Sequence, residues 1–489
     1  MRKMKENACN NKNQKKNPGF LLSAVSSNSG KTAAACGLMS AFKQEGKRVC
    51  ACKCGPDYID PMFHREVLGV DSKNLDLFFS EEDILKEGYL KHTKDADITI
   101  TEGVMGFYDG MSLDSVKGSS YDVAQTLGLP VILVINARGA AMTLVATVKG
   151  IAEFCPDSNI RGILLNRVSA MLYPRLKAML ETELERIGHG EIKVVGYMPE
   201  DEAFHLESRH LGLVTPQEME NLQEKVRQAG EILAKTVDFE LLEQIAGEAA
   251  VSEESEKIGS LKSLNYPVRI AVARDEAFCF YYKDNLELLE SLGCEVIEFS
   301  PLHDKKLPEN VKGILLGGGY PELYGKELAE NQSMLESIRR ALDDKIPCLA
   351  ECGGFMYLHE EMEDTAGNVW KLVGRIHGKT FPTGKLVRFG YVNLQRNLEE
   401  DQISELKERM SIADSWILPG ENIRAHEFHY WDSTDSGSDC LAVKPDGKRK
   451  WECIHMEENL VAGYPHLYYP SCKEFAERFV EKCRSGYRE

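Results

Sequence analysis

Residues 26–32 combine the side chains and the position that nucleotide binding requires. They read Ser-Ser-Asn-Ser-Gly-Lys-Thr, after an apolar run at 19–25 and before a helical pattern at 32–45. Backbone N–H groups at a helix N-terminus bind phosphate oxygens, a lysine adds positive charge, and a threonine hydroxyl can ligate Mg²⁺. The sequence therefore predicts a nucleotide-binding phosphate loop that contains Ser29, Gly30, Lys31 and Thr32.

The strict phosphate-loop motif is incomplete here. It requires a glycine five residues before Gly30, and Val25 occupies that position. A serine-rich cap on an ordinary helix is the alternative interpretation. The order of strand, turn and helix around Gly-Lys-Thr favours nucleotide binding.

Carboxylates follow two further apolar runs. Residues 54–61 read Cys-Gly-Pro-Asp-Tyr-Ile-Asp-Pro, and residues 102–110 read Glu-Gly-Val-Met-Gly-Phe-Tyr-Asp-Gly. Single carboxylates in turns are more often helix caps or turn formers. In parallel sheets, however, ligands bind at the carboxyl ends of the strands, where carboxylate oxygens suit Mg²⁺. Two acidic turns beside a phosphate loop therefore indicate a metal and substrate site.

The second half of the chain carries a candidate cysteine nucleophile. Cys352 stands between an apolar run and two glycines. A sharp turn from strand to helix exposes such a nucleophile, and we expect the helix N-terminus to lower the pKa of its thiol. Backbone N–H groups of Gly353 and of Gly318, at a glycine-rich strand end, can form an oxyanion hole. Cys348 lies within the strand and is better interpreted as a buried structural cysteine.

A cysteine nucleophile needs a base, and two histidines compete for this role. His466 lies in Val-Ala-Gly-Tyr-Pro-His-Leu at 461–467, and His429 lies in His-Glu-Phe-His-Tyr at 426–430. For each of the other histidines, a solvated or core position is the default interpretation.

The elements that must position these residues alternate between strands and helices. This alternation predicts an α/β fold with mostly parallel sheets that are covered on both faces. A long polar helix is expected at 216–244. Besides 19–25, strands are expected at 48–53, 98–101, 131–135, 163–165, 194–197, 268–273, 296–299, 313–316 and 347–350.

Length and composition indicate a multidomain chain. Its 489 residues suggest roughly two to four domains. Residues 1–18 are polar and rich in Asn and Lys, so we expect a disordered leader there. Residues 246–266 are rich in Glu, Ser, Lys and Gly, and we expect a linker. The predicted domains are then 19–245 and 267–489.

The charge balance excludes some partners. The chain has 59 Lys and Arg against 77 Asp and Glu, a formal net charge of −18, which argues against a protein that coats nucleic acid. No apolar run approaches the ~18–20 residues of a membrane helix. The 14 scattered cysteines favour a reduced, cytoplasmic chain. Cys50, Cys52 and Cys54 share one strand face, which predicts a buried apolar face rather than a metal site.

Several segments together resemble those of a known family. Residues 55–61 and 102–110, with Leu-Asn-Arg-Val at 165–168 and Arg-His-Leu-Gly-Leu at 209–213, are similar to segments of the cobyrinate a,c-diamide synthases. These are glutamine-dependent amidotransferases of cobalamin synthesis, and the resemblance runs from about residue 19 to residue 469. It implies a dethiobiotin-synthetase-like phosphate-loop domain, followed by a class I glutamine amidotransferase-like domain.

The resemblance implies roles for the N-terminal residues. The loop through Lys31 and Thr32 would hold ATP, and Thr32 would bind Mg²⁺ together with Asp57 and Glu102. The substrate and the phosphoryl-transfer centre would be contacted by Tyr58, Asp60 and Asp109. This chain departs from the family pattern where glycines are usual, at Ala24, Ser26 and Asn28, and where an Asp is expected, at Asn136.

It also implies roles in the second half. Cys352 would attack glutamine, and the family pattern favours His466 over His429 as its base. Related enzymes have a Glu two residues beyond that histidine, but Tyr468 stands there, so we expect a Cys–His dyad.

The implied reaction is amidation of the a and c acetates of cobyrinate with ATP, Mg²⁺ and glutamine, through acyl phosphates. The same chemistry on nickel-sirohydrochlorin or hydrogenobyrinate is the nearest alternative, and residues 55–61 favour the a,c enzyme over cobyric acid synthase relatives. A non-catalytic nucleotide-binding scaffold, similar to partition ATPases, is an alternative of another class. A homodimer is compatible with the sequence, which does not fix the oligomeric state.

Overall fold

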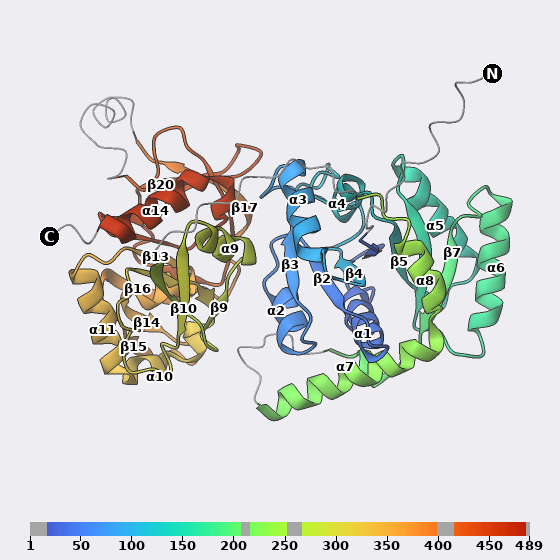
Figure 1. Cartoon of the computed structure of the whole chain (residues 1–489), viewed down its shortest axis with the longest axis horizontal. Helices are drawn as coiled ribbons and strands as arrows, with labels where there is room; N and C mark the ends of the chain where they lie inside the picture. The colour runs from blue at the N-terminus through green and yellow to red at the C-terminus, as the bar shows by residue number, and fades with distance from the viewer. Residues whose placement is uncertain (1–16, 207–215, 252–266, 399–414, 486–489) are drawn as a thin grey trace, which may run out of the picture. The chain divides into compact units, whose positions relative to one another are not determined.

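The computed structural model describes residues 17–206, 216–251, 267–398 and 415–485 (Figure 1). The chain divides into two compact units, Met1–Ile258 and Gly259–Glu489. Each unit contains a largely parallel sheet flanked by helices, which confirms the predicted α/β fold. Most of the predicted leader, most of the predicted linker and the segment at 209–213 lie outside the described residues.

A parallel seven-stranded sheet organises the first unit. Its strand order is β3-β2-β4-β1-β5-β6-β7. The central strand β1 is buried along its whole length, as expected for an apolar strand covered on both faces. Because β1 lies between β4 and β5, the loops after these three strands meet at one edge of the sheet. The strands are β1 Gly19–Ala24, β2 Val49–Cys54, β3 Ser72–Leu75, β4 Ile98–Glu102, β5 Val131–Asn136, β6 Ile160–Asn166 and β7 Lys193–Met198.

Helices follow most of these strands and cover both faces of the sheet. The prediction of one helix at 216–244 is wrong, because the chain forms two helices there. The Asp238 carboxylate accepts a hydrogen bond from the N–H of Leu241 at 3.0 Å and so caps a new helix. The helices are α1 Lys31–Gln44, α2 Ile59–Glu66, α3 Glu82–Thr93, α4 Ser120–Leu127, α5 Met142–Phe154, α6 Tyr173–Arg186, α7 Pro216–Thr236 and α8 Phe239–Ala246.

A six-stranded sheet organises the second unit. Its order is β10-β8-β11-β13-β23-β22, and only the β22–β23 pair is antiparallel. The strands are β8 Val268–Ala273, β10 Cys294–Phe299, β11 Gly313–Leu316, β13 Cys348–Glu351, β22 His455–Met456 and β23 Leu460–Gly463. The helices of this unit include α9 Lys283–Ser291, α10 Gly325–Glu330, α11 Gln332–Asp343, α12 Gly353–Tyr357 and α14 Lys473–Ser485.

Further strands join this unit and were not predicted. Two of the sheets that they form have the orders β15-β14-β16-β19 and β21-β20-β17-β18-β24, and β12 pairs with β9. These strands are β9 Phe278–Phe280, β12 Gly318–Gly319, β14 His359–Glu363, β15 Val369–Lys371, β16 Ile376–Pro382, β17 Arg388–Arg396, β18 Ile423–His429, β19 Trp431–Ser433, β20 Cys440–Val443, β21 Lys450–Cys453 and β24 His466–Leu467.

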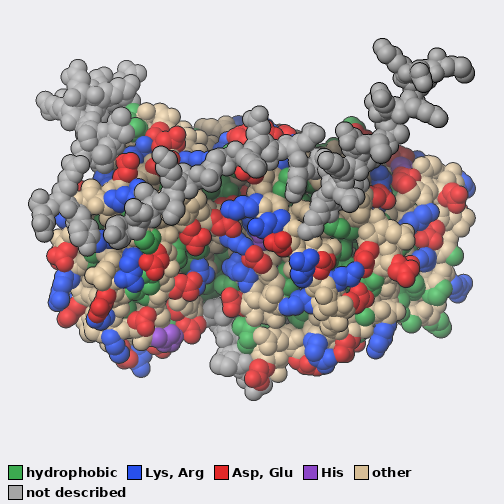
Figure 2. Space-filling model, in the orientation of Figure 1, with side chains coloured by type: hydrophobic (Ala, Val, Ile, Leu, Met, Phe, Trp, Pro, Cys, Tyr) green, Lys and Arg blue, Asp and Glu red, His purple; other side chains and the backbone are tan. Residues whose placement is uncertain are grey.

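The surface carries both signs of charge. Figure 2 shows acidic and basic side chains intermixed over the face in view, without a broad field of one sign. Across the described ranges, we find no helix with the length and apolar character needed to cross a bilayer.

Candidate functional site

The phosphate loop joins β1 to α1 in the arrangement that the sequence predicts. Asn28 has a φ of 61° and Gly30 a φ of 96°. Asparagine tolerates this left-handed conformation better than most residues, which explains how Asn28 can replace a glycine of the family pattern. The amide of Asn166, at the end of β6, donates a hydrogen bond to the carbonyl oxygen of Ser29 at 2.9 Å and so holds the loop against the sheet edge.

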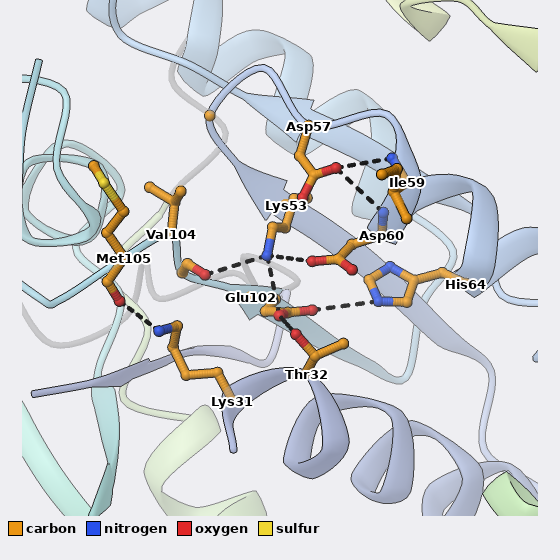
Figure 3. A network of polar contacts seen from close by, with 12 residues as sticks. Lys31, Thr32, Lys53, Asp57, Ile59, Asp60, His64, Glu102, Val104 and Met105 are labelled. Atoms are coloured by element: carbon orange, nitrogen blue, oxygen red, sulfur yellow. Dashed lines mark hydrogen bonds and ion pairs between the residues drawn. The ribbon is translucent and has the colours of Figure 1, made fainter. Parts of the chain in front are cut away.

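Lys31 begins α1 and is largely buried. Its ammonium donates a hydrogen bond to the carbonyl oxygen of Met105 (Figure 3). It also donates to the carbonyl oxygen of Ser26 at 3.4 Å. Burial lowers the pKa of Lys31, and the positive charge of Lys53 lowers it further. Two lysines therefore share this edge of the sheet.

A buried polar network lies beside the loop (Figure 3). The hydroxyl of Thr32 donates to Glu102 Oε1 at 2.6 Å. The Nζ atom of Lys53 lies 3.0 Å from the same oxygen and 2.6 Å from Asp60 Oδ2. Burial disfavours the ammonium of Lys53, but the negative charges of Asp60 and Glu102 outweigh it and raise the pKa of Lys53. The network therefore keeps Lys53 charged.

Lys53 was missed by the sequence reasoning. It lies in β2 on the face opposite Cys52 and Cys54, both fully buried, as the interpretation of an apolar face requires. A lysine inside an otherwise apolar strand, directly before an acidic turn, was the signal that could have revealed it.

The proposed Mg²⁺ ligands lie in this network. Thr32 and Glu102 present adjacent oxygens, and Glu102 Oε2 is buried without a hydrogen-bond partner among the described residues. His64 Nε2 lies 3.5 Å from that oxygen. Burial raises the pKa of Asp57 to about 6, and the charge of Asp60 adds to this effect. Each of these carboxylates therefore stands in a strongly charged environment.

The metal donors that this network offers are few. No cluster of three or more His, Cys, Asp or Glu side chains with the arrangement of a metal site occurs in the part of the chain that the structure describes. Mg²⁺ is commonly held by one or two protein side chains together with water and substrate phosphates. A hydroxyl and a carboxylate next to a phosphate loop fit that mode of binding.

The predicted substrate residues occupy different positions. Tyr58 precedes α2 and is half-buried, whereas Asp60 is buried and ion-paired with Lys53. Asp109 is exposed, and its carboxylate accepts a hydrogen bond from the N–H of Gly106 at 2.8 Å. Asp109 and Tyr58 are thus the more accessible of the three.

Cys352 forms a sharp turn between β13 and α12. Its φ of 48° and ψ of −103° are unusual for a residue other than glycine and match the strained elbow that the sequence predicts. The N–H of Cys352 donates to the carbonyl oxygen of Gly463 at 2.8 Å, which fixes the elbow against β23.

The expectation of a lowered thiol pKa is wrong for this structure. Burial raises the pKa of Cys352, and the nearby carboxylate of Glu322 raises it further. The N–H of Gly353 is directed at the thiol and lowers the pKa, but this effect is smaller. Helix α12 has five residues, so its dipole is too weak to offset burial.

The glycines around the elbow are packed closely. A Cβ atom on Gly318 would lie 2.4 Å from His466 Cε1, and one on Gly353 would lie 3.1 Å from the backbone nitrogen of Gly319. The strand β12 therefore contacts both the elbow and the imidazole of His466. This places the predicted oxyanion glycines and the predicted base around one centre.

His466 and His429 differ in their surroundings. Burial lowers the pKa of His466 to about 3, so its imidazole is neutral near pH 7. His429 stacks on Tyr464 with ring centroids 3.9 Å apart, and its Nε2 lies 3.1 Å from Glu427 Oε2. Its ring is thus held by packing and by a buried carboxylate.

Comparisons with known proteins cover nearly the whole chain. Residues 269–472 match the CobB/CobQ-like glutamine amidotransferase domain, and residues 21–214 match the CobQ/CobB/MinD/ParA nucleotide binding domain. A protein of Caldanaerobacter subterraneus subsp. tengcongensis named cobyrinate a,c-diamide synthase is 37% identical over 474 residues, 96% of this chain and 99% of its own. Proteins of the same name from Clostridium tetani (39% over 471 residues, 95% and 99%) and Priestia megaterium (35% over 476 residues, 97% and 98%) are also similar.

A nucleotide-binding domain followed by a glutamine amidotransferase domain defines an amidotransferase ligase, so the prediction of an enzyme rather than a non-catalytic scaffold is confirmed. The chain belongs to the cobyrinate a,c-diamide synthase family.

Proposed function

We propose that this protein amidates the a and c acetate side chains of cobyrinate with ATP and glutamine. The match to relatives named cobyrinate a,c-diamide synthase over about 95% of the chain carries the proposal. The two chemically different sites support it. Activation of the carboxylate is assigned to residues 19–245, and release of ammonia to residues 267–489.

The glutaminase step begins at Cys352. Its sulfur attacks the side-chain amide carbon of glutamine, while the imidazole of His466 accepts the thiol proton and passes it to the departing ammonia. The backbone N–H groups of Gly318 and Gly353 stabilise the oxyanion that forms. Water then hydrolyses the thioester and releases glutamate.

The synthetase step makes the acetate carbon reactive. A carboxylate oxygen attacks the γ-phosphorus of ATP, ADP departs, and an acyl phosphate forms. Ammonia then attacks the acyl carbon, and phosphate leaves with the former carboxylate oxygen. Backbone groups of Ser29 and Gly30 bind the phosphates, and the ammonium groups of Lys31 and Lys53 stabilise the charge of the transferring phosphoryl group.

Mg²⁺ is the metal that the donor oxygens favour. Thr32 and Glu102 would hold it, with Asp57 nearby, and the bound ion would supply further charge neutralisation at the phosphates. Asp60 fixes the position of Lys53 through their ion pair. Tyr58 and Asp109 are the residues proposed to contact the tetrapyrrole.

The experiment that tests the substrate is a competition assay. Purified protein with ATP, Mg²⁺ and glutamine is offered cobyrinate, hydrogenobyrinate and nickel-sirohydrochlorin together, and each product is quantified by mass spectrometry. Preferential diamidation of cobyrinate is expected. Preferential amidation of either other ring would contradict the proposed substrate.

All cysteines that the structure describes are free thiols, which supports a cytoplasmic location.

A further inference from the structure

A carboxyl side chain next to the proposed nucleophile has no role in the mechanism above. Glu351 is the last residue of β13 and directly precedes Cys352. The hydroxyl of Tyr469 donates a hydrogen bond to Glu351 Oε1 at 3.0 Å. The N–H of Leu467 is directed at the same carboxyl group. Glu351 therefore connects the strand of the nucleophile to the segment that follows His466.

The segment that carries His466 is fixed along one edge by β18. Strand β24 pairs antiparallel with β18, with His466 opposite His426. Just beyond β24, the N–H of Tyr468 donates to the carbonyl oxygen of Arg424 at 2.9 Å. Because residue 468 is a tyrosine, no carboxylate occupies the position two residues beyond the histidine. The position of this imidazole therefore depends on how its backbone is held.

Two polar side chains hold the other edge of this segment. The buried amide of Asn285, in α9, donates to the carbonyl oxygen of Leu467 at 2.7 Å. The Oδ1 atom of Asn285 accepts a hydrogen bond from the N–H of Tyr469 at 2.8 Å. Glu351 binds the side chain of the same tyrosine. Of these two side chains, Glu351 is the one whose strand ends at Cys352, so it links the position of the base to that of the nucleophile.

The surroundings of Glu351 favour an uncharged carboxyl group. Burial raises the pKa of Glu351 to about 8, and the hydrogen bonds from Tyr469 and Leu467 lower it by a smaller amount. The carboxyl group is thus mostly protonated near pH 7 and acts through hydrogen bonds rather than through charge. A glutamine at position 351 would have the same shape and would keep an oxygen that accepts both hydrogen bonds.

We propose that Glu351 is a positioning residue for glutamine hydrolysis, which sets the place of His466 relative to Cys352 through Tyr469 and Leu467. The inference rests on the proposed glutaminase activity and adds a residue that acts through its neighbours. The distance between a nucleophile and its base affects the chemical step more than it affects substrate binding. Loss of the Glu351 side chain should therefore lower kcat and leave KM nearly unchanged.

The kinetics of glutamine hydrolysis in a set of variants test this role. In Glu351→Ala we expect kcat to fall about 10- to 100-fold, with KM within about twofold of wild type. Glu351→Gln should recover most of the wild-type kcat, because its amide oxygen accepts the same hydrogen bonds. Tyr469→Phe loses one hydroxyl and keeps the ring, so kcat should fall about 3- to 10-fold. Added to Glu351→Ala, Tyr469→Phe should have no further effect, because both changes remove the same contact.

A matched control separates positioning from a general loss of packing. Glu363→Ala removes another half-buried glutamate at the end of a strand, β14, and should leave kcat unchanged. Unchanged kcat in Glu351→Ala would overturn the inference, and so would a loss in Glu351→Gln as large as that in Glu351→Ala. Unchanged kcat in Tyr469→Phe would also overturn it, even where the alanine variant does not fold. Wild-type protein that hydrolyses no glutamine would instead contradict the proposed function.

Discussion

Lys31 and Lys53 concentrate positive charge where ATP is proposed to bind. Replacement of Lys31 by Ala should reduce both glutamine-driven and ammonia-driven synthesis at least about 100-fold, since charge stabilisation at the phosphoryl group is lost in either case. Phosphate release with each nitrogen source measures this. Lys86→Ala, at a half-buried position of α3 where the lysine pairs with Glu82, should retain full activity. Intact turnover in the Lys31 variant would remove the basis for the ATP assignment.

Cys352 is proposed to act only on glutamine. Cys352→Ala should therefore lose glutamine-driven synthesis while synthesis from ammonium salts continues, because ammonia enters after the thioester step. Cys348→Ala, within β13, should keep its glutaminase activity. The two nitrogen sources are compared by product quantification at equal protein concentration. An alanine variant at 352 that still hydrolyses glutamine would exclude this nucleophile.

Single residues show where sequence reasoning succeeds and where it fails. Lys31 and Thr32 are recognisable because their chemistry follows from one short loop and the helix after it. Lys53 is not, because its charge is tolerated in a buried strand only through Asp60 and Glu102, which come from other elements. The thiol pKa of Cys352 also depends on burial by distant parts of the chain, which local sequence does not reveal.

The strand β12 places its glycines against His466. In Gly318→Ala the added Cβ would lie 2.4 Å from His466 Cε1, so the imidazole must move away. We expect kcat for glutamine hydrolysis to fall about 10- to 100-fold, as misplacement by about 1 Å commonly does. Gly150→Ala, where the new Cβ meets no atom within 4 Å, is the matched control. Unchanged kcat in Gly318→Ala would argue against His466 as the base.

His359 connects α12 to β19 through two hydrogen bonds of its ring. Its Nδ1 lies 2.9 Å from the carbonyl oxygen of Phe355, and its Nε2 lies 2.7 Å from Ser433 Oγ. Burial lowers the pKa of His359 to about 4 from an ordinary value of 6.5. The unfolded chain therefore binds the proton first, and stability is lost as the pH falls from about 6.5 to 4, by at most about 1.4 kcal/mol per pH unit.

Denaturant unfolding at several pH values measures this loss. His359→Gln should flatten the dependence between pH 6.5 and 4, and the residual slope should come from His426 and His466, whose pKa values burial lowers to about 3. An unaltered slope would show that His359 titrates alike in the folded and the unfolded chain, and so would contradict the lowered pKa.

Elements with a strong apolar period are the ones that sequence predicts well. The buried strands β1, β5 and β8 follow their apolar runs closely. The strands between β14 and β21, most of them paired antiparallel, alternate polar and apolar residues only weakly, and they gain their pairing partners from far along the chain. Asp238 shows the same limit in a helix, because its cap decides where α8 begins.

The whole chain joins a nucleotide-binding domain to a glutamine amidotransferase domain. The strand–helix alternation predicted two α/β regions, and the family resemblance supplied their chemistry. The composition predicts less about fold and function, because the net charge of −18 forms no broad field of one sign on the face in Figure 2. Neither the alternation of strands and helices nor the composition predicts which tetrapyrrole is the substrate.

Isotope transfer tests the coupling of the two activities most directly. Full-length protein is incubated with cobyrinate, ATP, Mg²⁺ and glutamine labelled with ¹⁵N in its side-chain amide, and the corrinoid product is analysed by mass spectrometry. The account predicts a diamide in which both new nitrogens are ¹⁵N, with one ADP and one phosphate released for each. Hydrolysis of glutamine and ATP without labelled nitrogen in the macrocycle would contradict it.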